Sequence, residues 1–308
     1  MKLKSVLFFA IVVLFAFTLP PADVKLQYQF KQGDQYVWSQ DTKQKIKQTV
    51  MGMDQDSENL YQSEFILKVV EVTTTGAKLE ATFTKLKNSS KSPMGANQMD
   101  SDGPADKMEN KIFQSMINKP FFVFLSSSGN VEKIEGAQNL WSGFDSLEMD
   151  DARKKTIRES LQMMLGEEAL KSSFQSAFVP YPEKKIKQGD KWTSTQNVVM
   201  NFAMSIENNW SLVTMSSDGA DLFAEGIFKT TDKEKIIDLP GGLKAKSDLN
   251  GKQAIKTKVN SKSGWPSKQE MLVELKGTMI LLAGGMVPQD MEIPMEIVSE
   301  TTYVITQK

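Results

Sequence analysis

The sequence contains no cysteine and no histidine among its 308 residues. Without cysteine there is no disulfide, so the fold depends on packing and hydrogen bonds alone. Without histidine, a Ser-His-Asp triad, a Cys-His pair and any zinc site built from His or Cys are excluded. Only carboxylate, Ser/Lys or Tyr chemistry remains for catalysis, and the sequence has no Gly-rich phosphate loop and no G-x-S-x-G elbow. We therefore expect a protein that is not an enzyme, with a carboxylate-based hydrolase as the third-ranked alternative.

Arginine occurs only at positions 153 and 158, and the formal net charge is −1. Because arginine is the side chain that best binds phosphate, we expect no nucleic-acid partner.

The sequence contains 18 methionines, whose thioethers are soft metal ligands that suit Cu(I). No His or Cys is present to complete a copper site, so we expect the methionine side chains to fill apolar space. An EF-hand-like run starting at Asp54 has Phe65 where calcium needs a Glu. The sequence predicts no metal and no cofactor.

A short apolar run follows two lysines at the N-terminus. Lys2 and Lys4 precede an apolar stretch from Val6 to Leu19, which is the layout of a secretory signal peptide. A membrane span needs about 20 apolar residues, so this run is too short, and no later segment is long enough. We expect a signal peptide over residues 1–22, with an uncleaved anchor as the alternative. The protein is then periplasmic or secreted, without a lipobox cysteine and without a transmembrane span in the mature chain.

Part of the sequence occurs twice. The run FKQGDQY at Phe30–Tyr36 returns as IKQGDKW at Ile186–Trp192, and we interpret Asp34 and Asp190 as turn caps rather than paired catalytic carboxylates. Two further pairs of turn-like segments follow in the same order: Gly76–Leu79 with Gly219–Leu222, and Ser128–Gly129 with Ser263–Gly264. The pattern predicts an internal repeat from a diverged duplication. Recurrent hairpin chemistry without common ancestry is the alternative.

Both halves have the period-two alternation of antiparallel strands, as in Ile255, Thr257 and Val259. Asn250-Gly251 precedes that run and is typical of a two-residue hairpin turn. Residues 88–109 are rich in Ser, Asn, Asp, Gly and Pro, which predicts a long mobile loop. The fold class we expect is mainly β (α+β), with two antiparallel β halves that are curved sheets or partial barrels.

Two helical segments separate the β halves. Apolar residues at 157, 161, 164 and 165 form one helix face, Gly166 supplies a break, and a second face follows before Pro180. We therefore divide the chain, after the signal peptide, into a first β half at 23–136, a helical connector at 137–179 and a second β half at 180–308.

Three further segments are distinctive: the pattern Y-x-F-K-x-G-D-x-Y at Tyr28–Tyr36, FFVFLSSSGNVEKIEG at Phe121–Gly136, and VPYPEKKIKQGDKW at Val179–Trp192. In these segments the chain resembles a family of exported proteins of unknown function from Gram-negative bacteria. The resemblance implies a β-rich fold and an envelope location, and it brings no activity, ligand or catalytic residue. A looser likeness in architecture is to periplasmic lipoprotein carriers, whose curved sheet holds an acyl chain.

The apolar segment TMILLAGGMV at Thr278–Val287 is the best sequence indication of binding. Met279, Leu281 and Met286 are the candidate ligand-facing residues, although an ordinary buried strand and turn explains the segment as well. We predict a non-enzymatic envelope protein that binds a hydrophobic or lipid-like molecule, or an envelope partner, in a curved β-sheet. The alternative from another class is a structural or assembly protein of the cell envelope.

Overall fold

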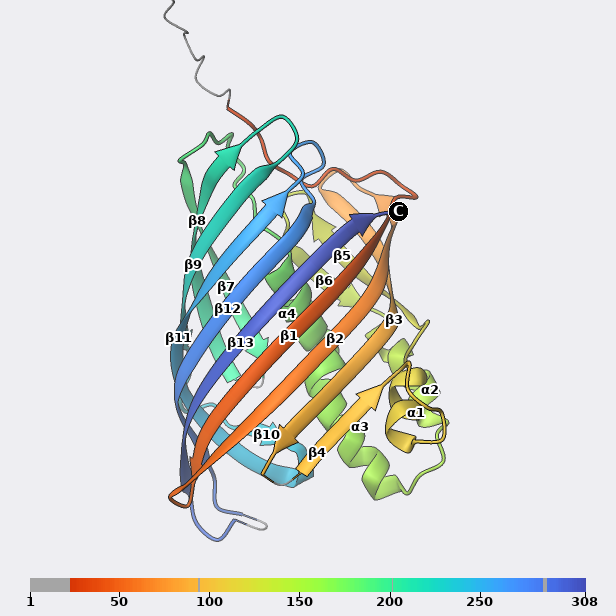
Figure 1. The fold of residues 1–308 in the computed structure, drawn as a ribbon, viewed down its shortest axis with the longest axis vertical. Coiled ribbons are helices and arrows are strands. Elements are labelled where there is room, and N and C mark those ends of the chain that lie inside the picture. Colours follow the sequence, from red (N-terminus) through yellow and green to blue (C-terminus); the bar gives the residue numbers. More distant parts are fainter. Residues whose placement is uncertain (1–22, 94, 201, 285–286) are drawn as a thin grey trace, which may run out of the picture.

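A computed structural model describes residues 23–93, 95–200, 202–284 and 287–308. The expected signal peptide at 1–22 lies outside the described residues. Within the described part of the chain, thirteen strands form one antiparallel sheet (Figure 1). The strands of the first half are β1 (Gln35–Val50), β2 (Met53–Val72), β3 (Gly76–Ser92), β4 (Gly95–Asp100), β5 (Pro120–Ser126) and β6 (Val131–Glu135). Those of the second half are β7 (Lys191–Met200), β8 (Phe202–Met215), β9 (Ala220–Thr230), β10 (Ile237–Leu239), β11 (Leu243–Val259), β12 (Pro266–Leu281) and β13 (Met291–Gln307).

The two halves share this sheet. Its strand order is β6-β5-β3-β2-β1-β13-β12-β11-β9-β8-β7, with β4 beside β3 and β10 beside β11. The chain therefore runs from the middle of the sheet to one edge, crosses through the helices, and returns from the opposite edge to the middle. The first and last strands meet there, with Trp38 of β1 opposite Ile305 of β13.

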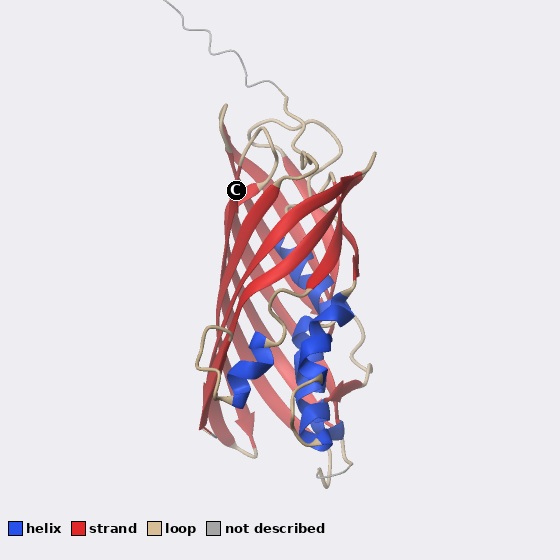
Figure 2. Cartoon of the chain, turned by 90° about the vertical axis from the view of Figure 1, so that its right-hand side faces the viewer, coloured by secondary structure: helices blue, strands red, loops and turns tan. Residues whose placement is uncertain are grey.

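The helices lie inside the curve of the sheet, as Figure 2 shows from the side. They are α1 (Met108–Gln114), α2 (Trp141–Asp145), α3 (Asp151–Leu165) and α4 (Glu167–Ala177), with short 3-10 turns at Ala137–Leu140 and Pro240–Gly242. The predicted helix pair with a break at Gly166 is confirmed. α4 contacts both β6 and β7, the two edge strands, so it bridges the opening that the curled sheet leaves.

Side-chain alternation separates the two faces of the sheet. In β11 the residues at even positions from 244 to 258 include five lysines, whereas the odd positions are Ala, Ser, Leu, Gly, Gln, Ile, Thr and Val. The lysines are on the convex face, which contacts water, and the odd positions point toward the helices and the opposite strands. The burial pattern of β13 follows the same rule.

The main core lies between the sheet and the helices and includes buried residues of α1, α2, α3 and α4; its upper end is where Figure 1 marks the C-terminus. There the segment before β1 and the segment after α4 cross the end of the sheet, joined by hydrogen bonds between Val24 and Ile186. Tyr28 belongs to the first of these segments, and its backbone N–H donates to Ser127 O at 2.8 Å. Trp265, at the turn before β12, stacks on Tyr36 of β1 with ring centroids 3.9 Å apart.

The same turn geometry occurs at the start of β1 and of β7. In the first half, Gly33 has φ of 93°, its N–H donates to Val69 O at 2.8 Å, and Val69 N–H donates to Asp34 O at 2.9 Å. The second half has φ of 92° at its glycine and bonds of 2.8 and 3.0 Å between the equivalent groups: Gly189 N–H with Leu212 O, and Leu212 N–H with Asp190 O. The side chains that follow each turn, Tyr36 and Trp192, are buried, as expected for the first inward residue of a strand.

Two sequence predictions were wrong. Residues 88–109 are not a long loop, because β3 continues to Ser92 and pairs with β4, and α1 begins at Met108. Their polar composition reflects a hairpin of hydrated side chains rather than missing structure. Asn250-Gly251 is not a hairpin turn either, since both residues lie inside β11. A Cβ at Gly251 would come within 2.0 Å of Glu274 O, so this glycine serves the close approach of β12.

Candidate binding face

The lower part of the concave face, away from the main core, carries a second apolar cluster. Its buried members come from five neighbouring strands of the second half: Met204, Ile206, Phe228, Leu249, Leu275, Met295 and Ile297. Leu249 is fully buried, while the neighbouring Ile46, Val273 and Met279 are only half-buried. At this end the sheet thus presents an apolar surface whose central side chains are buried and whose peripheral side chains are partly accessible to solvent.

The candidate residues predicted from sequence lie at this margin. Met279 and Leu281 are inward positions of β12, both half-buried, and Met279 packs against the second apolar cluster. They pair with Ile293 and Met291 of β13. Met286, the third candidate, lies outside the described residues. The structure therefore brings Met279 and Leu281 onto one surface, together with apolar residues that sequence reasoning did not single out.

A row of uncharged polar side chains separates the second apolar cluster from the main core. The strand registers align these residues at one level across the sheet. We call this row the belt: Ser194, Asn208, Gln253, Ser299, Gln44, Asn59, Ser90 and Asn97. The residues that complete the level are Gly226 and Val273.

Hydrogen bonds link the belt side chains to one another. Gln253 Nε2 donates to Asn208 Oδ1 at 2.7 Å, and this pair is buried. Gln44 Nε2 donates to Ser299 Oγ at 3.2 Å, and Asn59 Nδ2 donates to Gln44 Oε1 at 3.1 Å. Buried amides need such partners. Leaving a buried amide without a hydrogen bond destabilises the folded protein by more than a single hydrogen bond stabilises it.

Glycine makes the buried part of the belt possible. Gly226 lies between Asn208 and Gln253 in the register, and a Cβ there would come within 2.2 Å of Asn208 Oδ1. Gly251 and Gly277 continue a diagonal of inward glycines across β11 and β12, where a Cβ would meet backbone oxygens at 2.0 Å. Missing side chains along this diagonal let the strands curve tightly around the apolar cluster.

The concave face is uncharged at neutral pH. In β1, β2, β11, β12 and β13, which the structure describes in full, the inward positions hold no Asp, Glu, Lys or Arg. The titratable inward groups in these strands are tyrosines. Burial raises the pKa of Tyr61 and of Tyr303, and burial with nearby Asp34 raises the pKa of Tyr36 to about 12, so all three stay neutral.

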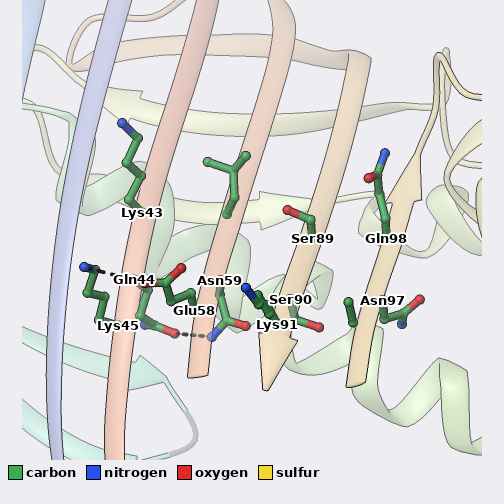
Figure 3. A pocket seen from close by; sticks show the side chains of 12 residues that line it. Lys43, Gln44, Lys45, Glu58, Asn59, Ser89, Ser90, Lys91, Asn97 and Gln98 are labelled. Atoms are coloured by element: carbon green, nitrogen blue, oxygen red, sulfur yellow. Dashed lines mark hydrogen bonds and ion pairs between the residues drawn. The ribbon is translucent and has the colours of Figure 1, made fainter. Parts of the chain in front are cut away.

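A groove of about 610 Å³ lies at the level of the belt in the first half (Figure 3). It is lined by three consecutive residues from each of four strands, and the central residues of these triplets are the belt members Gln44, Asn59, Ser90 and Asn97. The flanking residues alternate to the other face and include Lys45, which pairs with Glu58 at 3.6 Å. Met279 and Leu281 do not line this groove.

Other kinds of site receive no support from the geometry. The described residues contain no group of three or more His, Cys, Asp or Glu side chains placed to hold a metal ion. Asp34 and Asp190 sit at the two turns described above, where Asp190 Oδ2 accepts from Lys187 N–H at 3.0 Å. Among the described residues, no helix has the length and apolar composition needed to cross a bilayer.

Sequence reasoning missed the belt. Its signal was present: in β1 the inward residues Gln40, Thr42 and Gln44 are polar and uncharged, whereas the outward residues between and after them are charged. Gln44 and Asn59 are 15 residues apart and become neighbours only through the β1–β2 pairing. A polar residue at an inward position normally argues against a core strand, so its meaning depends on the register of the whole sheet.

Comparison with known proteins gives a family and no function. A family model described as a family of unknown function, DUF6263, matches residues 74–266. No curated protein matches the chain. Among solved structures, an outer membrane channel from Pseudomonas putida F1 is similar with a TM-score of 0.27 at 8% identity, covering 91% of this chain and 97% of that one. The translocator domain of the autotransporter NalP from Neisseria meningitidis gives a TM-score of 0.23 at 6% identity, covering 90% and 89%.

Scores this low carry no argument about fold or function. The family match spans more than half of the sequence and includes strands of both halves as well as the helices between them. It extends from the turn before β3 to the start of β12. The chain belongs to DUF6263, a family of unknown function.

Proposed function

We propose that this protein binds a hydrophobic, lipid-like molecule on the concave face of its sheet, at the second apolar cluster. One observation carries the proposal. The cluster is separate from the main core, and its half-buried neighbours Ile46, Val273 and Met279 lie on a face without charges. Apolar surface that remains accessible beside a buried cluster favours a ligand or partner that covers it.

The binding we propose is non-enzymatic, and its place is the cell envelope. No reactive constellation accompanies the apolar surface in the described residues, and the residue types that most enzymes use as bases and nucleophiles, His and Cys, do not occur. The envelope location rests on the signal-peptide pattern of residues 1–22. A structural or assembly role in the envelope is the alternative, in which another protein covers the same surface.

We also propose that the two halves arose by duplication. The matching turns at Gly33 and Gly189 support this, with the same φ and the same two backbone hydrogen bonds. So does the next hairpin, where Thr73 N–H donates to Gly76 O at 2.8 Å and Ser216 N–H donates to Gly219 O at 2.9 Å. In this scheme the second apolar cluster is a specialisation of the second half, because the inward residues of β1 and β2 below the belt are mostly polar, as at Gln48, Gln55 and Ser57.

The test is binding of the uncharged fluorophore N-phenyl-1-naphthylamine to the full-length protein, purified without detergent. Met279→Asp places a charge on the concave face and is expected to weaken binding at least tenfold. Ile280→Asp changes the adjacent residue of β12, whose side chain points to the convex face, and is expected to leave binding unchanged. Circular dichroism of both variants checks that the sheet is intact.

Two results would overturn the proposal. One is absence of saturable binding by the wild-type protein, and the other is equal binding by the Met279 and Ile280 variants. Native mass spectrometry of the same preparation adds an independent readout, because a co-purifying mass of a few hundred daltons that is lost on denaturation identifies a bound molecule. A measured mass equal to that of the protein alone would favour the assembly alternative. Cross-linking in the intact envelope then tests that alternative.

A further inference from the structure

We infer that the ligand is an uncharged amphiphile, with a hydroxyl- or amide-bearing head held at the belt and an apolar chain lying on the second apolar cluster. This inference rests on the proposed function and narrows it to one chemical class. It depends on three features of the concave face: the level of the belt, the absence of charge, and a buried acceptor without a partner.

The belt changes from buried to accessible along its length. Asn208 and Gln253 are 4% and 7% exposed, and they satisfy each other through their 2.7 Å hydrogen bond. Gln44 and Asn59 are half-buried, and Asn97 is exposed. The accessible amides are therefore those of β1, β2 and β4, where the groove of about 610 Å³ lies. A polar head fits this end of the belt, since amides both donate and accept hydrogen bonds.

The apolar surface begins one inward position below the belt. In β13 the inward residues after Ser299, toward the lower end, are Ile297, Met295, Ile293 and Met291. The distance from Ser299 to Met291 along the strand is about 26 Å at 3.3 Å per residue, which accommodates a fatty-acyl chain. Head and chain of one molecule can thus be bound at the belt and at the apolar cluster together.

A buried acceptor next to the belt indicates what the head must offer. Asn88 is the inward residue of β3 one level above Ser90, opposite Tyr61 of β2. Its Oδ1 is buried, and none of the described residues donates a hydrogen bond to it. Asn88 does not line the groove itself, so a ligand hydroxyl or N–H donor satisfies this oxygen by reaching past the belt residues. A carboxylate or a methyl ester has no proton to donate and cannot satisfy it.

A charged head is disfavoured on this face. Moving an ion from water to a half-buried surface is unfavourable unless an opposite charge receives it, and the inward positions of the surrounding strands supply none. Lys43, Lys45 and Lys91 also line the groove, but alternation directs their side chains to the opposite face. Tighter binding of an anionic head than of a neutral one would show that these lysines reach the ligand, and would overturn the inference.

The experiment compares three ligands with the same oleoyl chain and different heads, each measured by displacement of N-phenyl-1-naphthylamine from the full-length protein. The ligands are 1-monooleoylglycerol, which is neutral and donates hydrogen bonds, methyl oleate, which is neutral and does not donate, and oleate, which is anionic. We expect monooleoylglycerol to bind at least tenfold more tightly than either of the others. A smaller ratio to either one overturns the inference while leaving the proposed function in place. Failure of all three to bind overturns both.

Two substitutions test whether the preference for a hydrogen-bond-donating head arises at Asn88. Asn88→Ala removes the buried acceptor and is expected to weaken monooleoylglycerol binding at least fivefold while methyl oleate binding stays unchanged. Lys87→Ala changes the preceding residue of β3, which is on the opposite face and does not line the groove, and is expected to change neither. Because none of the described residues donates to the Asn88 oxygen, the alanine variant is expected to fold. Equal loss of both ligands, or no loss of either, would contradict the role of this acceptor.

Discussion

The phenolic oxygen of Tyr28 accepts a hydrogen bond from the backbone N–H of Val179 at 2.9 Å. Both residues are buried, and the bond ties the segment before β1 to the end of α4, 151 residues later in the chain. Tyr28 also contacts the rings of Phe178 and Trp265 edge-on. Together with the backbone hydrogen bonds between Val24 and Ile186, this side chain closes the upper end of the sheet.

Tyr28→Phe is therefore expected to destabilise the protein by about 1–3 kcal/mol, because it leaves the buried N–H of Val179 without an acceptor. Urea unfolding followed by tryptophan fluorescence measures the loss. Tyr61→Phe removes a hydroxyl that is not part of this link, and we expect it to have the smaller effect. If the two variants unfold at the same urea concentration, the Tyr28 bond does not stabilise the closure.

Alkaline pH is expected to unfold the protein. Burial raises the pKa of Tyr28, Tyr181 and Tyr303, whereas tyrosines of the unfolded chain ionise near pH 10. The unfolded state then binds fewer protons than the folded state once the pH passes about 10, so the free energy of unfolding is constant below that pH and falls above it.

Tyrosinate absorbance and near-ultraviolet circular dichroism, followed together in one alkaline titration, check this. All five tyrosines have raised pKa values. Ionisation is expected only as the circular dichroism signal is lost. Tyrosinate that forms near pH 10 with the signal intact would contradict the burial argument.

The glycines of the two matching turns are expected to be equally sensitive. Gly33 and Gly189 have φ of 93° and 92°, and nothing lies within 4 Å of a Cβ built at either one. Alanine at either position is destabilising by about 1–2 kcal/mol through backbone strain alone. Urea midpoints of the two alanine variants and of the matching asparagine variants test this, since asparagine tolerates positive φ better. Unequal losses at the two positions would argue that the turns are not equivalent.

Gly226→Ala is expected to break the buried part of the belt. The new Cβ would lie 2.2 Å from Asn208 Oδ1 and 2.9 Å from Gln253 Cγ, so the amide pair must separate. We expect a loss of about 1–3 kcal/mol, which is typical of overpacking. Adding Asn208→Ala makes room for the methyl group, so the double variant is expected to lose less than the sum of the single variants. Additive losses would show that the clash is relieved elsewhere.

Local sequence patterns correctly predicted the helix pair and the antiparallel strands, because short stretches of sequence specify them. Apolar spacing placed α3 and α4, Gly166 marked the break between them, and period-two alternation indicated antiparallel strands. The turn at Ser263–Gly264 was also located, because Gly264 needs a positive φ of 71°. Each of these depends on residues within one turn or one strand of each other.

The arrangement of the strands could not be predicted in this way. Pairing of β1 with β13 joins residues at opposite ends of the chain, and no local pattern specifies that register. The glycine of Asn250-Gly251 resembles a turn signal, yet it is needed for contact with Glu274 of the next strand. The belt depends on the same long-range registers, so sequence reasoning placed only Met279 and Leu281 of the candidate face, and their role in binding stays a prediction.

The seam between β1 and β13 also sets the order in which the molecule can form. Trp38 and Ile305 face each other across it, so the middle of the sheet stays incomplete until β13 has been made. Contacts of such long sequence separation make folding slow. A nascent chain therefore cannot join its two half-sheets until β13 has been made, and β1 and β12 keep unpaired edges up to that point.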